Sequence, residues 1–461
     1  MIPASLLRTK LRFVVLYGLA LAYFIWLTTP DYTFANTGVD TGAFIWSAKQ
    51  WPNIGLTHPT GYPLFNWING LLLLDDPSIQ ASVQRIALVS ALASATTALV
   101  LYVHSKKLIA PLVFIASGVV VSQSTIVEVY AIATLLAVLI YVTRKDKWRF
   151  WVVAVLALGT HHFIGLALLP VLWWRWQNRP DLRKLDWLIF PTALVQYGLL
   201  LFAVRPELIG WSDLSWRGYF SGQSFMFMGI TPEARGHIRL YEFLGVVVGG
   251  FGLSILFITL IIKWHWRKDW LLALLVVLPL IYYVSHLIPQ SFTYTMPAFA
   301  FAGLMLAKHW RDVKPLWKKG LVINSLVLVA INLATLDIGN NLDPAPTTAR
   351  VVIDSMESLP EGSVVYTGKR GWEQLAAWHI DGITVVADEK WLLEIEQGPD
   401  YVTVVDNAER YGASLIACSD WNTCLDRSEG DYYLERPRIE QPPSFILGDD
   451  VDGVSSIRPL R

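Results

Sequence analysis

Long stretches without a formal charge recur along the first 340 residues of this chain. They are residues 13–30, 86–103, 108–127, 187–204, 243–262 and 320–336. The hydrocarbon core of a bilayer is about 30 Å thick and takes about 20 apolar residues in a helix, so each stretch is close to the required length. The uncharged stretch 270–307 is long enough for two helices, and its prolines favour that division. With residues 129–143 and 150–174, these stretches predict a polytopic α-helical membrane protein.

Composition and charge support this class. Only 16% of the residues are charged, against about 25% in a typical soluble protein, which excludes an ordinary soluble enzyme and a disordered chain. The formal net charge of zero conceals a division near residue 344. Residues 345–461 carry 10 basic and 21 acidic side chains, a net charge of −11, and the remainder carries +11. The two parts are therefore expected in different surroundings.

Basic residues cluster in the short segments between the apolar stretches, and the positive-inside rule places such clusters in the cytoplasm. All of them can be cytoplasmic only if residues 148–175 form a short hairpin that turns at Gly159–His162, which gives about 11 crossings in all. The protein is then expected in the plasma membrane or a cell inner membrane, with its N-terminus in the cytoplasm. Residues 13–30 are better interpreted as an uncleaved first span than as a signal peptide.

This topology makes residues 1–340 the transmembrane part and puts two long loops outside, at about residues 31–85 and 205–242. The apolar piece Tyr62–Leu74 is too short to span comfortably, so it is expected as a helix at the membrane surface.

The acidic tail, residues 345–461, is also external. It alternates predicted strands at 362–368, 383–388 and 401–407 with helix-like segments, one of them at 408–416. This alternation predicts a small extracytoplasmic α/β domain with a largely parallel sheet. Cys418 and Cys424 are the only cysteines, and either a disulfide or two thiols fits their spacing.

Polar residues from several segments gather on the predicted outer side, where ionisable groups at membrane depth are candidates for function. Asp40 lies in the first external loop and is the candidate general base for a hydroxyl acceptor; the alternative is that it caps a helix beginning near Thr41. A departing phosphate needs cationic donors. The candidates for substrate binding are His58, Tyr62, Glu128, His161, His162, Arg205 and Gln290.

Four motifs in the first half of the chain resemble a known family. Asp40-Thr41-Gly42 followed by His58-Pro59-Thr60-Gly61-Tyr62-Pro63-Leu64 resembles the signature of a membrane protein family long labelled a domain of unknown function. That family includes transmembrane O-mannosyltransferases and belongs to the GT-C glycosyltransferase superfamily. Three further segments resemble other motifs of that family: Glu128-Val129-Tyr130-Ala131, Gly159-Thr160-His161-His162 and Trp216–Phe225. The resemblance covers roughly residues 10–240.

The resemblance implies a GT-C-like fold and a glycosyltransferase. Such an enzyme moves a sugar, with mannose as one candidate, from a polyprenyl-phosphate donor to an extracytoplasmic glycan or protein acceptor. Asp40 matches the family's catalytic base, whereas Ala43 stands where the family usually has Glu. The lipid-linked sugar would be a co-substrate, and the need for a divalent metal stays open. No nucleic-acid partner is expected.

Two non-catalytic alternatives remain. One is a transporter or lipid-handling scaffold, although most of the candidate polar residues lie at one face rather than at mid-membrane. The other is a partner subunit of a glycosylation complex, which the departure at Ala43 keeps open.

Overall fold

The computed structural model describes residues 4–28, 44–45, 48, 62–75, 79–203, 244–252, 254–285 and 291–337, together with three strands in the tail. The chain divides into two compact units. The first comprises residues 1–29, 50–72 and 84–343, and the second comprises residues 30–49, 73–83 and 344–461. Each unit is described by itself below.

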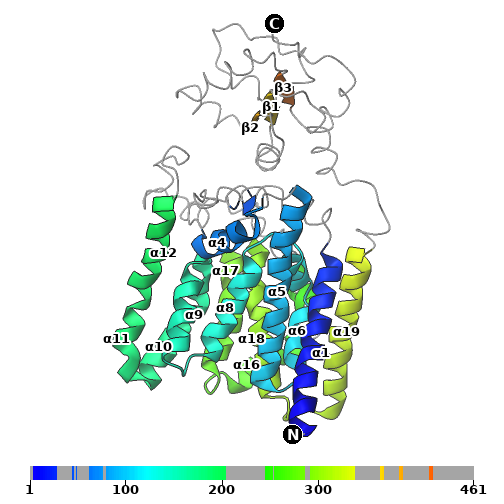
Figure 1. The fold of residues 1–461 in the computed structure, drawn as a ribbon. Helices are drawn as coiled ribbons and strands as arrows, with labels where there is room; N and C mark the ends of the chain where they lie inside the picture. The colour runs from blue at the N-terminus through cyan, green and yellow to red at the C-terminus, as the bar shows by residue number, and fades with distance from the viewer. Residues whose placement is uncertain are drawn as a thin grey trace, which may run out of the picture. The chain divides into compact units, whose positions relative to one another are not determined.

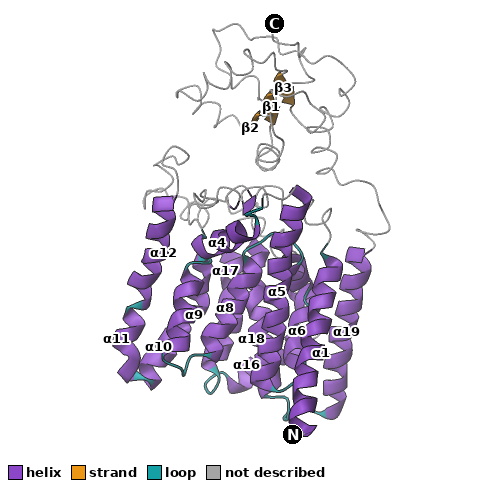
Figure 2. Ribbon diagram, viewed as in Figure 1, coloured by secondary structure: helices purple, strands orange, loops and turns teal. Residues whose placement is uncertain are grey.

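Helices make up the described part of the first unit (Figures 1 and 2). They are α1 (Ala4–Leu27), α4 (Pro63–Leu72), α5 (Ile79–Ser105), α6 (Ile109–Ala116), α7 (Gly118–Ser124), α8 (Tyr130–Val142), α9 (Trp148–Leu158), η1 (His162–Ile164), α10 (Gly165–Asn178), η2 (Pro180–Leu182), α11 (Arg183–Trp187), α12 (Ile189–Ala203), α16 (Ser254–His265), α17 (Trp270–Ser285), η4 (Ser291–Thr295), α18 (Met296–Lys308) and α19 (Pro315–Asp337). The long helices lie side by side as a bundle, and α4 lies across one end of it (Figure 1).

The burial pattern shows which helices are central. Nearly every side chain of α18 from Met296 to Ala307 is buried, so α18 forms the centre of the core. In contrast, α1 and α19 expose large apolar side chains, among them Leu19, Ile323 and Val327. An exposed apolar face on this scale is stable where lipid covers it.

By length and composition, two of the described helical segments could cross a membrane: Ala81–Ser105 and Pro315–Thr335. A third is reached if the bent pair Leu244–Phe251 and Ser254–His265 counts as one span. Shorter apolar helices accompany them, at Leu11–Leu27, Tyr130–Val142, Trp148–Leu158 and Trp270–Val284. The prediction of eleven crossings therefore stays a prediction.

Three features of the helical prediction are present. Residues 148–178 form two helices, α9 and α10, joined by a turn at 159–164. The stretch 270–307 is divided into α17 and α18, with the short 3-10 helix η4 between them. The apolar piece after Tyr62 is a ten-residue helix, α4.

Two stretches predicted as continuous helices are instead broken. Residues 108–127 contain α6 and α7, because Ser117 adopts an extended conformation with φ −71° and ψ 126°. Residues 243–262 bend by more than 40° next to Gly252, whose φ of +50° favours glycine.

Helix α19 supplies a side chain to each break. The Asn332 amide donates to the Ala116 carbonyl over 2.9 Å, and the Asn324 amide donates to the Phe251 carbonyl over 3.2 Å. A break in an apolar bundle leaves main-chain groups without helical partners, and such groups must be satisfied by neighbours. The two asparagines meet that requirement.

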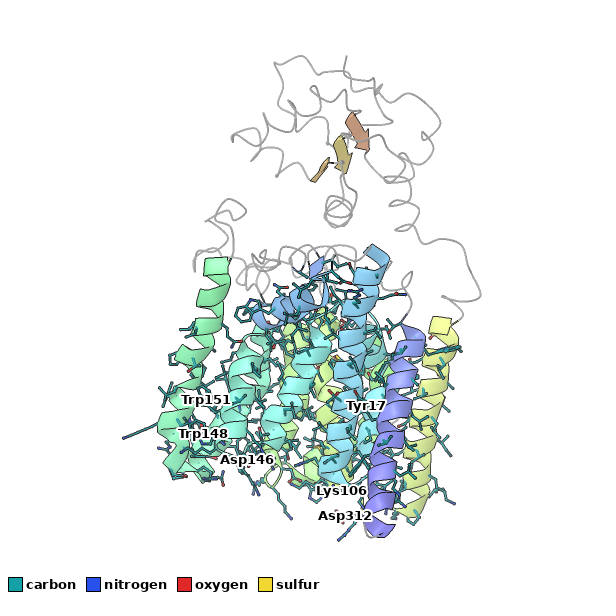
Figure 3. All side chains as sticks on the ribbon, viewed as in Figure 1. Tyr17, Lys106, Asp146, Trp148, Trp151 and Asp312 are labelled. Atoms are coloured by element: carbon teal, nitrogen blue, oxygen red, sulfur yellow. The ribbon has the colours of Figure 1, made fainter. Side chains whose placement is uncertain are left out.

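Loops that carry basic residues share one end of the bundle, called here the basic end. Figure 3 shows Lys106, Asp146 and Asp312 toward the end where the N-terminus lies. The turn between α8 and α9 is tied to the segment after α10, because Arg179 donates to the Lys145 carbonyl over 2.9 Å. The grouping agrees with the predicted topology, while the side of the membrane that the basic end faces stays a prediction.

In the second unit, three strands form a parallel sheet in the order β2-β1-β3: β1 (Val364–Thr367), β2 (Thr384–Ala387) and β3 (Leu415–Cys418). In its register, Val365 pairs with Val385 on one side and with Ile416 on the other. Two of the predicted strands are present. The predicted helix at 408–416 is wrong at its end, because Leu415 and Ile416 belong to β3.

The remaining predictions for the tail lie outside the described residues. They include the strand at 401–407 and Cys424, so the disulfide with Cys418 and the α/β domain as a whole stay predictions.

Candidate functional site

Two of the sequence motifs meet at the end of the bundle opposite the basic end. The Tyr62 hydroxyl lies 3.3 Å from Nε2 of His161, 99 residues away, and the two rings stack with centroids 4.9 Å apart and planes 15° apart. The backbone confirms the contact, since the Leu64 amide donates to the Gly159 carbonyl over 2.9 Å. The turn between α9 and α10 thus holds the start of α4.

Hydrogen bonding determines the protonation state of His161 in this arrangement. Its Nδ1 accepts the main-chain N–H of Phe163 over 3.1 Å, so Nδ1 carries no hydrogen. A neutral imidazole with an unprotonated Nδ1 carries its hydrogen on Nε2. The Nε2–H group therefore donates to the Tyr62 hydroxyl, and the His161 ring, which is 1% exposed, is uncharged.

Tyr62 has a strained backbone. Its φ of +40° places a bulky residue in the left-handed region, and such a conformation costs on the order of 1–3 kcal/mol. Pro63 follows at the first position of α4, where a proline fits a helix start. The stack on His161 and the hydrogen bond offset this cost. Backbone strain of this kind is a reason to suspect a functional position.

Aromatic rings from three further positions surround His161. The centroids of Phe163, Tyr130 and Tyr294 lie 4.9, 5.4 and 5.8 Å from the centroid of the His161 ring. Tyr130 begins α8 and Tyr294 lies in η4, so the cluster joins the ends of three helical segments. We call these five residues (Tyr62, Tyr130, His161, Phe163 and Tyr294) the aromatic cluster.

Glu128 lies in the turn between α7 and α8, two residues before Tyr130. It is 3% exposed, and its carboxylate accepts the Val129 N–H over 3.4 Å. Its main-chain carbonyl accepts a hydrogen bond from the Ser90 hydroxyl on α5 over 3.0 Å. The turn that bears Glu128 is thereby fixed to a neighbouring helix.

The structure thus brings together three of the predicted site residues, Tyr62, His161 and Glu128, at the same end of the bundle. His162 begins η1, but its side chain lies outside the described part of the chain. Asp40, His58, Arg205 and Gln290 also lie outside the described residues, so their roles stay predictions.

Three members of the aromatic cluster were missed as site residues: Tyr130, Phe163 and Tyr294. Tyr130 belongs to the motif Glu128–Ala131, and that proximity could have drawn attention to it. Tyr294 lies in the uncharged segment that also holds the candidate Gln290, and it belongs to none of the recognised motifs. Within the residues that the structure describes, no group of three or more His, Cys, Asp or Glu side chains could hold a metal ion.

Comparison with known structures identifies the fold. The chain resembles ArnT from Cupriavidus metallidurans, solved in the apo state, with a TM-score of 0.55 and 13% sequence identity over 93% of this chain and 97% of that one. ArnT is a GT-C glycosyltransferase, so the bundle has the fold of that class of membrane protein.

The sequence comparison matches part of the chain to a family model. Residues 40–199 match the family model described as the N-terminal domain of the protein O-mannosyl-transferase TMEM260. The matched range begins at Asp40 and includes Tyr62, Glu128, His161 and His162. No curated protein matches the sequence significantly. The fold and the family model together support a GT-C membrane glycosyltransferase of an O-mannosyltransferase-like family, as the sequence motifs indicate.

Proposed function

We propose that this protein transfers a sugar from a polyprenyl-phosphate donor to a hydroxyl acceptor, a glycan or a protein, on the non-cytoplasmic side of the membrane. The observation that supports it best is the contact between Tyr62 and His161. It joins two motifs of the matched family, 99 residues apart, at the end of the bundle away from the basic loops.

In the proposed reaction, the Asp40 carboxylate takes the proton of the acceptor hydroxyl as general base. The acceptor oxygen attacks the anomeric carbon of the sugar, and the bond from that carbon to the phosphate oxygen breaks. The polyprenyl phosphate leaves with the electron pair, stabilised by cationic and hydrogen-bonding groups. Arg205 and His58 are the candidates for that stabilisation in the external loops, and mannose is the first sugar to test.

The test is a transfer assay on membranes supplied with undecaprenyl-phosphate-[3H]mannose. Asp40→Asn should reduce transfer by about 10²-fold or more, as removal of a general base does, while the protein still folds and reaches the membrane. Asp31→Asn, in the same loop, is the matched control and should keep its activity. Full activity of Asp40→Asn would refute the assignment of the base.

The departure at Ala43 provides a second measurement. The family usually has Glu at this position, so Ala43→Glu should change the rate or the sugar preference if the position contacts the donor. A protein with no transfer activity in either form, with mannose or other lipid-linked sugars, would favour the partner-subunit alternative.

A further inference from the structure

We propose that His161 is a positioning residue of the transfer reaction, which acts through Tyr62 as a neutral hydrogen-bond donor and not as a cation. This inference rests on the proposed function. It goes beyond that function by naming how the turn between α9 and α10 contributes to the site.

The first step is the charge of the ring. A protonated imidazole carries a hydrogen on both nitrogens, so it could not accept the Phe163 N–H at Nδ1. His161 is also almost fully buried, with the rings of Phe163 and Tyr130 packed around it. His161 therefore supplies no positive charge to a departing phosphate, and that task passes to other groups.

The second step is what the ring holds in place. Tyr62 is strained, and its ring lies flat on His161 with its hydroxyl bonded to Nε2. A strained backbone persists only when its surroundings fix it. Tyr62 directly follows the segment His58–Gly61 in the sequence, so the residue that His161 holds lies next to that segment within the first external loop.

The third step is the consequence for catalysis. A displacement of about 1 Å in a group that orients a substrate can reduce the rate by about 10²-fold. Loss of the Tyr62–His161 hydrogen bond should therefore lower kcat more than it raises KM, since the bond acts on the orientation of the site.

Three variants separate the two bonds of His161. Tyr62→Phe removes the hydroxyl and keeps the ring stack. His161→Asn places an acceptor near the position of Nδ1 but has no group near Nε2. His161→Gln places an amide donor near Nε2 but loses the acceptor for Phe163. Tyr102→Phe, on α5 near the basic end, is the control for loss of a tyrosine hydroxyl.

With undecaprenyl-phosphate-[3H]mannose as the donor, we expect Tyr62→Phe and His161→Asn each to lose 10- to 100-fold in kcat. The double variant should lose no more than the worse single variant, because both remove the same bond. His161→Gln should keep at least ten times the kcat of His161→Asn. Equal losses in the two His161 variants with an active Tyr62→Phe would instead indicate a charge on His161 and overturn the proposal.

A measurement that needs no sugar transfer tests the positioning role of His161 independently of the proposed function. A single cysteine is placed by Thr60→Cys in a chain with Cys418→Ser and Cys424→Ser, and its reaction with an impermeant maleimide is timed. Tyr62→Phe and His161→Asn should change the labelling rate several-fold relative to the parent, and His161→Gln should change it less. Unchanged rates in all three variants would overturn the positioning role, even if mannose proves to be the wrong sugar.

Discussion

The guanidinium of Arg175 and the carboxylate of Asp186 form an ion pair in which neither side chain is exposed to solvent. Nη2 of Arg175 lies 2.8 Å from Oδ1 of Asp186, and Nη1 donates to the carbonyls of Arg144 and Asp146 over 2.6 and 2.9 Å. The Phe150 ring lies 3.9 Å from the guanidinium carbon. The pair ties the turn between α8 and α9 to α10 and α11 at the basic end.

Because the pair is buried, removal of one partner should destabilise the protein far more than removal of both. Asp186→Ala leaves the guanidinium unpaired and should lower the free energy of unfolding by about 3–5 kcal/mol. The double variant Arg175→Met with Asp186→Leu should recover part of that loss, because no buried charge remains. The thermal midpoints of the two purified variants in detergent measure the loss and the recovery.

The exposed pair of Arg179 and Asp181 offers a matched control at the same end of the bundle. Its carboxylate is 58% exposed, so Asp181→Ala should leave the thermal midpoint unchanged. Comparable losses from Asp181→Ala and Asp186→Ala would contradict the assigned role of burial.

The amide of Asn332 closes the break between α6 and α7, and its removal should destabilise the bundle. Asn332→Leu leaves the buried Ala116 carbonyl without this donor, which should cost about 1–3 kcal/mol. Thr335→Val, one turn further along α19, removes only a hydroxyl bonded within its own helix and should have a small effect. The thermal midpoints of the two variants test the difference, and equal midpoints would show that the amide is dispensable.

The Asp269 carboxylate predicts an acid-sensitive contact at the basic end. Burial opposes its ionisation, but hydrogen bonds from Lys308 and His309 outweigh burial and lower the pKa of Asp269 below its ordinary 3.8. A carboxyl whose pKa is lower in the folded state contributes stability above its unfolded pKa, and this contribution is lost as the pH falls through the folded value. The free energy of unfolding of the native protein should therefore exceed that of Asp269→Asn by its full amount near pH 6. This difference should shrink below about pH 3.8.

Urea unfolding of both proteins in detergent at pH 3, 4 and 6 measures this difference. Asp312→Asn serves as the control, because its carboxylate is exposed. An advantage that grows toward low pH would have the opposite sign and would refute the lowered pKa.

Hydropathy predicted the class of fold because lipid-facing helices need long uncharged stretches. The positive-inside rule located the hairpin at 148–175, because cytoplasmic positions for both Arg144 and Arg175 required two crossings between them. Hydropathy did not predict the break at Ser117, since serine and glycine are common inside membrane helices. The partner that makes the break tolerable, Asn332, lies 216 residues from Ala116, whose carbonyl it binds.

Only part of the site was predicted, because the sequence does not show contacts between distant segments. The motifs that contain Tyr62 and His161 could be recognised one by one, but their contact depends on how α4 packs on the turn after α9. The strained φ of Tyr62 is also a property of the packed molecule. In the tail, Leu415 and Ile416 were assigned wrongly because a short apolar run fits a strand and the end of a helix equally well.

Cysteine labelling tests the predicted orientation of the bundle. In the chain without Cys418 and Cys424, a cysteine at position 312 lies in an exposed turn at the basic end and should react only after the cells are permeabilised. A cysteine at position 223, in the predicted external loop, should react in intact cells. Labelling of position 312 in intact cells would reverse the orientation.

A close approach of α18 to α6 in the core predicts a strong effect of a single methyl group. A Cβ added at Gly303 on α18 would lie 2.4 Å from the Ala110 carbonyl oxygen on α6, and a main-chain atom cannot rotate away. Gly303→Ala should therefore cost about 1–3 kcal/mol or more through overpacking. Gly320→Ala on α19 meets nothing within 4 Å and should be neutral or stabilising by up to about 1 kcal/mol. Thermal midpoints in detergent compare the two. Because the clash is with a carbonyl, Ala110→Gly should fail to rescue Gly303→Ala, and a full rescue would show that the side chain at position 110 sets the spacing.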